Sequence, residues 1–193
     1  MKLDKSFYLR DNVVLIAEEL LGKYLFTNID GEVTGGIITE TEAYAGITDK
    51  ASHAFNDRKT KRTEIMYRTG GIAYVYLCYG MYSLFNVVTK IEGIPHALLI
   101  RGLHPTEGID VIKNRTKHTN LDKYTINGPG KLTKALGIHY SLTGTNLEGN
   151  TIWLEDRDYK FDKENVIITK RVGVDYAKED ALLPYRFILN LKK

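Results

Sequence analysis

Residues 72–88 read Ile-Ala-Tyr-Val-Tyr-Leu-Cys-Tyr-Gly-Met-Tyr-Ser-Leu-Phe-Asn-Val-Val, a stretch without a single charge. Two apolar runs, 72–78 and 83–89, flank a short connection that contains Gly80, and this pattern predicts a β-hairpin. Four tyrosines take the place of the aliphatic residues that a purely packed hairpin would use. Each brings a hydroxyl that needs a partner when it is buried. The stretch therefore predicts a hairpin whose surface suits a flat ligand with polar edges.

The rest of the chain supplies further strands and a few helices. Strands are predicted at residues 23–28, 36–44, 97–103, 151–154, 166–169 and 186–190, and helices at 11–21, 105–115 and 131–136. Asp11 is the expected cap of the first helix, and Gly137 ends the last. Residues 45–68 are expected to be irregular with short helical pieces. Strands cluster and few strand–helix–strand crossovers are visible, which indicates an α+β fold with a mainly antiparallel, curved sheet, peripheral helices and a protruding hairpin.

Length and composition limit the possible classes of protein. A chain of 193 residues without a linker-like stretch favours a single domain over 1–193. The single cysteine, Cys78, excludes an internal disulfide and a cysteine-based zinc site. The five histidines show no metal-ligand spacing, and neither a dinucleotide fingerprint nor a phosphate-binding loop is present. We therefore expect no metal and no cofactor. The uncharged stretch is short of the roughly 20 residues that a membrane helix needs, so no membrane span is expected.

Basic residues gather next to the tyrosine-rich hairpin. Residues 57–68 contain Arg58, Lys59, Lys61, Arg62 and Arg68 against Asp57 and Glu64. Such a run by itself is usually a solvated face. Beside an aromatic-rich segment it favours a polyanionic partner such as nucleic acid.

The strand at 36–44 places a carboxylate beside an aromatic ring. Alternation along a strand puts Ile38, Glu40, Glu42 and Tyr44 on one face. A carboxylate such as Glu42 can activate water and balance the positive charge that develops on a sugar when its bond to a base breaks. Two plain alternatives remain: a strand glutamate is usually solvated or salt-bridged, and alternating tyrosines usually pack a core.

Motifs along nearly the whole chain carry a family resemblance. They are Ile-Thr-Glu-Thr-Glu-Ala-Tyr at 38–44, Ala-Ser-His at 51–53, the segment 58–66, Tyr-Val-Tyr at 74–76, Tyr-Gly-Met-Tyr at 79–82 with Asn86, Leu-Leu-Ile-Arg at 98–101, Asn-Gly-Pro-Gly-Lys-Leu at 127–132, Arg-Val-Gly at 171–173 and Arg-Phe at 186–187. In order and spacing the chain resembles the alkyladenine DNA glycosylases, also called methylpurine or 3-methyladenine DNA glycosylases.

The resemblance implies an enzyme of base excision repair. Such an enzyme flips an alkylated or deaminated purine out of duplex DNA, hydrolyses its N-glycosidic bond and leaves an abasic site. The implied roles are general base for Glu42 with Arg101 beside it, base-pocket residues for Tyr44, His53, Tyr76 and Asn86, and a minor-groove wedge for Tyr79. His53 is also a candidate acid for neutral leaving groups. Tyr74 and Tyr82 are expected only to pack.

The expected partner is double-stranded DNA with damaged purines. Arg58, Arg62 and Lys131 are predicted to hold the DNA backbone, Lys131 together with the helix start after residues 128–130. The resemblance also implies a hydrolase without strand-cleaving activity. We expect it to act as a monomer, in the cytoplasm at the nucleoid if the source is bacterial and in the nucleus if it is eukaryotic.

Two rival functions stay open. A glycosidase acting on free nucleosides or RNA needs the pocket but not the Tyr79 wedge. A non-catalytic DNA-binding module needs the fold but not the Glu42 carboxylate.

Overall fold

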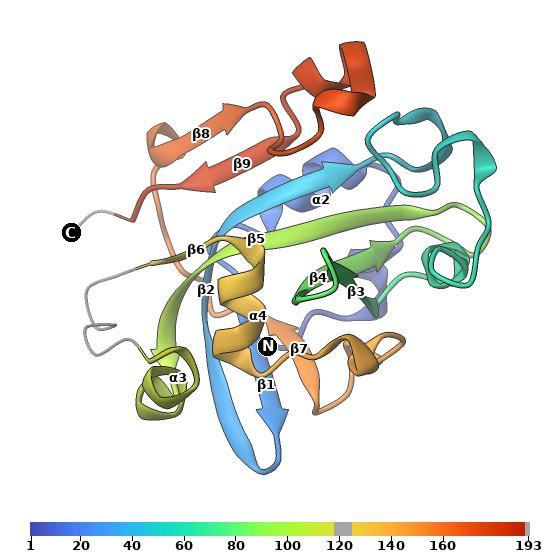
Figure 1. The fold of residues 1–193 in the computed structure, drawn as a ribbon. Coiled ribbons are helices and arrows are strands. Elements are labelled where there is room, and N and C mark those ends of the chain that lie inside the picture. Colours follow the sequence, from blue (N-terminus) through green and yellow to red (C-terminus); the bar gives the residue numbers. More distant parts are fainter. Residues whose placement is uncertain (118–124, 192–193) are drawn as a thin grey trace.

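The structure is a computed structural model that describes residues 1–117 and 125–191, and within these ranges nine strands form one curled sheet (Figure 1). The strands are β1 (Tyr24–Ile29), β2 (Glu32–Tyr44), β3 (Ile72–Cys78), β4 (Tyr82–Thr89), β5 (His96–Glu107), β6 (Ile126–Asn127), β7 (Ile152–Glu155), β8 (Val166–Thr169) and β9 (Arg186–Leu189). The central order is β3-β4-β5-β2-β1-β7, while β6 pairs with β5, β9 with β2 and β8 with β9. Every pairing is antiparallel, which confirms the predicted sheet.

Short helices surround the sheet, as an α+β fold requires. They are the α-helices α1 (Lys5–Tyr8), α2 (Val13–Glu19), α3 (Ile109–Thr116) and α4 (Pro129–Leu136), and the 3-10 turns η1 (Gly46–Thr48), η2 (Phe55–Asp57), η3 (Glu64–Tyr67), η4 (Tyr140–Leu142), η5 (Lys163–Asn165) and η6 (Asp175–Leu182). Helix α2 packs on β2, and α4 packs on β4 and β5. The irregular segment predicted after β2 is confirmed, because η1, η2 and η3 are its only regular pieces.

Two predicted helix starts are wrong. The cap of α2 is Asn12, whose Oδ1 accepts the N–H groups of Val14 and Leu15, whereas Asp11 pairs with Lys90. The helix expected from residue 105 begins at Ile109 instead, since β5 continues through Pro105 to Glu107. Pro105 lies beside a register shift opposite residues 35 and 36, and a proline, which cannot donate a ladder hydrogen bond, is tolerated next to such a bulge.

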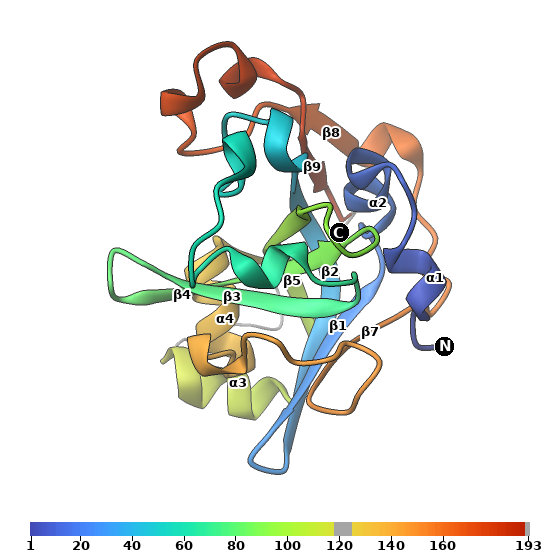
Figure 2. The ribbon, with the colours of Figure 1, turned by 90° about the vertical axis from the view of Figure 1, so that its right-hand side faces the viewer.

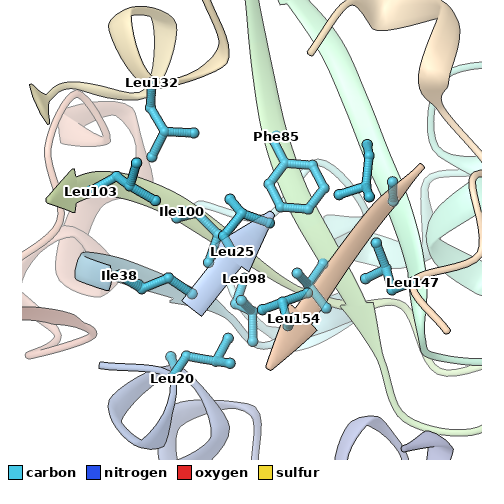
Figure 3. Close-up of a cluster of buried hydrophobic side chains, with 14 of the residues drawn as sticks. Leu20, Leu25, Ile38, Phe85, Leu98, Ile100, Leu103, Leu132, Leu147 and Leu154 are labelled. Carbon is cyan, nitrogen blue, oxygen red and sulfur yellow. The ribbon is translucent and has the colours of Figure 1, made fainter. Parts of the chain in front are cut away.

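The main core lies between the sheet and helices α2 and α4 (Figure 3). Leu20 comes from α2 and Leu132 from α4, and both meet aliphatic side chains of β1, β2, β5 and β7. These side chains are fully buried. The apolar stripes of two short helices are therefore stabilised by the sheet face that they cover rather than by their own length.

A register shift in the middle of the β2–β5 pairing makes the predicted face of Ile38 wrong. Thr39 is extra on β2, and Arg101 is extra on β5. Because side chains alternate with a period of two, one extra residue moves the following side chains to the other face. Ile38 therefore belongs to the main core together with Ala43, and it does not share a face with Glu42 as the simple alternation predicted. A glycine is needed at position 102, next to this register shift, because a Cβ there would lie 2.8 Å from the Cβ of Glu40.

Candidate functional site

A cavity of about 690 Å³ opens beside the β3–β4 hairpin. Its walls come from β2, β3, β4 and β5, from the segment after β2, from the start of α4 and from residues 172–176. The cavity brings together eight of the ten residues predicted for the site: Tyr44, His53, Arg62, Tyr76, Tyr79, Asn86, Arg101 and Lys131. Glu42 lies behind its wall, in contact with three residues that line it. Arg58 lines a neighbouring cavity instead.

Glu42 is fully buried, and its carboxylate is held from three directions. Oε2 accepts the hydroxyl of Tyr44 at 2.8 Å, and Oε1 accepts the backbone N–H of Val172 at 2.8 Å. Nε of Arg101 lies 3.4 Å from Oε1. The side chain is thus fixed in one orientation at the cavity, which is what a positioned base needs.

Opposing effects act on the ionisation of Glu42. Burial raises the pKa of its carboxyl above the usual 4.5, while Arg101, the Val172 N–H and the Tyr44 hydroxyl lower it. The neighbouring Glu40 charge adds a smaller upward effect on this pKa. A carboxylate with a raised pKa accepts a proton from water more readily than an exposed one does.

Arg101 links Glu42 to a second carboxylate. Its Nε donates to Oε1 of Glu40 at 2.8 Å, and Nε of Arg186 donates to the same oxygen at 2.7 Å. The side chain of Glu40 is 7% exposed. Two guanidinium groups therefore balance the buried carboxylates Glu40 and Glu42, which is the condition under which charges are tolerated away from water.

A third buried ion pair joins the loops around the site. The Arg171 guanidinium binds both carboxylate oxygens of Asp49, at 2.5 and 2.9 Å, and both side chains are almost completely buried. Arg171 also donates to the carbonyl of Ala43 and lies 4.9 Å from the ring centre of Tyr44. The pair fixes the chain just before Val172, whose N–H reaches Glu42. It thereby positions two of the groups that hold the carboxylate.

Three rings form the aromatic wall of the cavity. The centres of His53 and Tyr76 are 4.7 Å apart in an edge-to-face arrangement, and those of Tyr74 and Tyr76 are 5.3 Å apart. Tyr74 is buried and its hydroxyl lies 2.8 Å from Nδ1 of His53. The prediction that Tyr74 only packs is therefore too weak, because it also orients the histidine.

Hydrogen bonds define the state of His53. Arg62 Nη2 lies 3.1 Å from Nε2, and a guanidinium can only donate, so Nε2 is the acceptor and the ring proton belongs on Nδ1. Burial, with the charges of Arg62 and Arg58, lowers the pKa of His53 to about 4. The ring is therefore neutral at physiological pH, and this argues against its candidate role as a proton donor.

Asn86 forms a rigid polar part of the wall. It is 4% exposed, and its Nδ2 donates to the carbonyls of Tyr74 at 3.2 Å and Leu84 at 3.3 Å. Because both amide hydrogens are directed to the backbone, the carbonyl oxygen is the group with which the side chain can meet a ligand.

The β3–β4 hairpin protrudes from the rest of the molecule (Figure 2), and its connection is exposed and strained. The Met81 N–H binds the Cys78 carbonyl at 3.1 Å, and both residues between them have positive φ, 51° at Tyr79 and 68° at Gly80. Glycine accepts this conformation, whereas a tyrosine in it is unusual. The Tyr79 ring is 89% exposed. A strained, exposed aromatic residue next to a cavity points to a function in binding. Tyr82 is 53% exposed, more than its predicted packing role requires, although its ring covers Gly130.

The two predicted backbone-binding segments lie on different sides of the cavity opening. Arg62 reaches into the cavity itself and stacks on Tyr76, with 4.5 Å between its guanidinium carbon and the ring centre. Arg58 is exposed in the adjoining segment. Lys131 is exposed in the first turn of α4, which begins at Pro129. Cations therefore flank the opening on two sides.

Sequence reasoning missed several residues of the site as ligand contacts. Val172 and Tyr176 line the cavity, while Asp49 pairs with Arg171 and Glu40 pairs with Arg186 behind it. The motif at 171–173 was the available signal for Val172. Asp49 and Arg171 are 122 residues apart, so no local pattern links them. In the described ranges, 1–117 and 125–191, no cluster of potential metal ligands occurs. None of the helices described there is long and apolar enough to cross a membrane.

Known proteins resemble this chain over almost its whole length. The model of a family described as methylpurine-DNA glycosylase (MPG) matches residues 6–193. The chain is 47% identical over 192 residues to a Chlamydia felis protein, covering 99% of this chain and 97% of that protein. It is 46% identical over 191 residues to a Chlamydia abortus protein (98% and 99%) and 43% identical over 195 residues to a Desulfitobacterium hafniense protein (97% and 95%). All three relatives bear the name "Putative 3-methyladenine DNA glycosylase".

Proposed function

The chain belongs to the methylpurine-DNA glycosylase family, and on this premise we propose that it acts as a 3-methyladenine DNA glycosylase in base excision repair. It binds duplex DNA with a damaged purine, takes the nucleotide out of the stack and hydrolyses the bond between base and sugar. The observation that carries the proposed mechanism is the buried carboxylate of Glu42, held by Tyr44, Val172 and Arg101 behind the wall of an aromatic cavity.

Glu42 is the proposed general base. Its carboxylate takes a proton from water as the water oxygen bonds to C1′ of the sugar and the C1′–N bond breaks, with the bonding electrons leaving on the base. The negative charge of Glu42 also favours the positive charge that develops on the sugar. Arg101 supports this role, since its guanidinium lowers the pKa of Glu42 against the effect of burial and so keeps the carboxylate ionised.

The cavity suits a cationic alkylated purine. Tyr44, His53 and Tyr76 offer rings for stacking, and a cation on a tyrosine face gains about 0.5–2 kcal/mol. An alkylated cationic base also leaves as a neutral molecule, so it needs no acid. Asn86 presents its carbonyl oxygen to the edge of the base and is the proposed selective wall.

Deaminated purines are the weaker candidates for substrate. A neutral base needs a proton on its leaving nitrogen, and a His53 with a pKa of about 4 does not supply one near pH 7. We therefore propose that alkylated purines are released much faster than hypoxanthine.

The DNA itself is proposed to sit across the cavity opening. Tyr79 fills the space left by the flipped nucleotide, and Arg58, Arg62 and Lys131 meet phosphates on either side. A single copy of the chain is proposed to act on one lesion at a time. Its proposed location is the cytoplasm at the nucleoid, as the bacterial relatives suggest.

The deciding experiment replaces Glu42 by glutamine, which keeps the shape but cannot accept the proton. Base release from a duplex oligonucleotide with 7-methylguanine should fall by about 10²–10⁴-fold, while affinity for that duplex changes little. Glu164→Gln, at an exposed position, is the matched control and should keep full activity. Unchanged release by Glu42→Gln would refute the mechanism.

The same assay separates the rival functions. A DNA-binding module without catalysis would leave the methylated duplex intact with the parent protein as well. A nucleoside or RNA glycosidase would cleave free 7-methylguanosine or methylated RNA faster than the duplex.

A further inference from the structure

Arg62 extends into the aromatic cavity and contacts its wall. Its guanidinium stacks on Tyr76 at 4.5 Å, and Nη2 lies 3.1 Å from His53 Nε2. Its Nε donates to the Tyr74 hydroxyl at 3.3 Å. Arg62 thus contacts all three rings of the wall. It lies where a base that stacks on Tyr76 would have to lie.

The chemistry of the guanidinium matches that of the proposed substrate. It is a planar, delocalised cation with hydrogen-bond donors at its edge, and an alkylated purine is also a planar cation with polar edges. Both are attracted by the negative face of a tyrosine ring. A neutral purine gains less from the same face, yet it has to displace the same arginine.

Arg62 is able to leave the cavity at moderate cost. The residue is exposed, and it belongs to the irregular segment between η2 and η3. A second cavity of about 470 Å³ adjoins the first and shares His53, Arg62 and Tyr176 with it. Arg58 and Lys50 also line this second cavity, so it is basic and suits a DNA phosphate.

We propose that Arg62 is a placeholder and a specificity-determining residue: it stacks on Tyr76 until a cationic base displaces it into the neighbouring cavity, where it meets a phosphate of the flipped nucleotide. This inference rests on the proposed function. Because the cavity is open only in the fraction of molecules whose Arg62 has moved, the apparent affinity for any base is reduced by that fraction. Bases that replace the lost cation–π contact are favoured over those that do not.

The test uses free 3-methyladenine, which carries no phosphate and which, as a neutral base, gains least from the tyrosine face while it still has to displace Arg62. Arg62→Ala should bind this base more tightly than the parent, by about tenfold, which corresponds to about 1.4 kcal/mol. Arg62→Lys, which keeps the charge but loses the planar stack, should lie between the two. Lys61→Ala is the matched control: it removes an exposed cation of the same segment that lines neither cavity, and it should leave affinity for the free base unchanged.

Two results would overturn the placeholder. Unchanged affinity of Arg62→Ala for the free base would make Arg62 a phosphate contact alone, and weaker binding would make it a fixed part of the base wall. Thermal unfolding of each variant checks that the fold is retained. We expect it to be retained because Arg62 is exposed.

Base release by the parent protein, measured in parallel on a 7-methylguanine duplex, separates this inference from the proposed function. Release by the parent with unchanged binding by Arg62→Ala refutes the placeholder alone. A parent that neither releases base nor binds 3-methyladenine refutes both.

Discussion

Two regions that adjoin the cavity solve opposite physical problems. The charge cluster, defined as Glu40, Glu42, Asp49, Arg101, Arg171 and Arg186, buries three carboxylates against three guanidinium groups. The hairpin tip, residues 78–82, exposes apolar side chains instead: Tyr79 is 89%, Met81 70% and Tyr82 53% exposed. The charge cluster keeps charged groups away from water, whereas the hairpin tip leaves apolar surface in contact with water.

Each region departs from what folding alone would favour. Burying ion pairs gains little stability over apolar side chains of the same shape, and exposing aromatic rings at a strained turn gains none. The cluster makes sense as a preorganised environment for a reaction, since its groups are already oriented before a substrate arrives. The tip makes sense as a surface that is completed by a partner. We therefore assign chemistry to the charge cluster and DNA binding to the hairpin tip. Variants in one region should change its own property and leave the other property unchanged.

The largest effect is expected from breaking the buried pair in the charge cluster. Arg171→Met leaves Asp49 without its partner, and removing one member of a buried ion pair costs about 3–5 kcal/mol. Chemical denaturation should show this loss of unfolding free energy, together with reduced base release. The control is Lys59→Met, because the Lys59–Asp57 pair is 63% and 58% exposed and should contribute less than about 1 kcal/mol. Equal effects of the two variants would contradict the distinction between buried and exposed pairs.

The two regions also differ in how well the sequence predicts them. The tip follows from local signals, because two apolar runs around Gly80 fix both the hairpin and the position of Tyr79. Alternation was enough to place Glu42 beside Tyr44, but it failed at Ile38, since no residue type marks the bulge at Thr39. The bulge depends on how β2 and β5 pair, which is a long-range contact.

The charge cluster was largely hidden for the same reason. Asp49 meets Arg171 from 122 residues away, and Glu40 meets Arg186 from 146 residues away. Family motifs placed Arg101 beside Glu42 and marked the segment that starts at Arg171, but they did not indicate that Arg101 also binds Glu40 or that Arg171 binds Asp49. The position of Arg62 was wholly unexpected, because a basic run in a polar segment indicates an exposed face rather than a side chain stacked on Tyr76.

The second prediction removes the ring at the tip. Tyr79→Ala should weaken productive binding to damaged duplex by about 1–3 kcal/mol, the typical value of one stacking contact with a base. Free 3-methyladenine should bind as before, because its cavity stays intact. The free energy of unfolding should stay the same, since Tyr79 is 89% exposed and a φ of 51° is as unfavourable for alanine as for tyrosine. Tyr140→Ala, at another exposed tyrosine, is the control and should leave duplex activity unchanged. Full duplex activity of Tyr79→Ala would exclude the wedge.

The third prediction concerns the pH dependence of base release. Only ionised Glu42 accepts a proton, so the rate should rise with pH through its pKa, which burial raises above 4.5. In Arg186→Met, Glu40 loses one of two cations, and its less compensated charge raises the pKa of Glu42 further. The acid limb of the rate profile should therefore move to higher pH, with less than about tenfold loss at pH 7 and recovery at pH 9. A uniform loss at all pH values would mean that Arg186 acts through structure rather than through charge.

The smallest effect is expected from Lys131, an exposed cation at the start of α4. If it meets one phosphate, Lys131→Ala weakens binding to damaged and undamaged duplex alike and lowers the salt dependence of the binding constant by about one unit in the log–log slope. Lys163→Ala, on η5 and outside the lining of the cavity, tests whether any loss of positive charge has this effect. Lys131 lies outside both the charge cluster and the hairpin tip. Lys131→Ala should change binding and leave the rate of base release from bound DNA untouched, because the groups that shift the pKa of Glu42 are Arg101, Val172, Tyr44 and Glu40. A slower single-turnover rate at saturating Lys131→Ala protein would show that binding and chemistry are not divided between the two regions as their burial indicates.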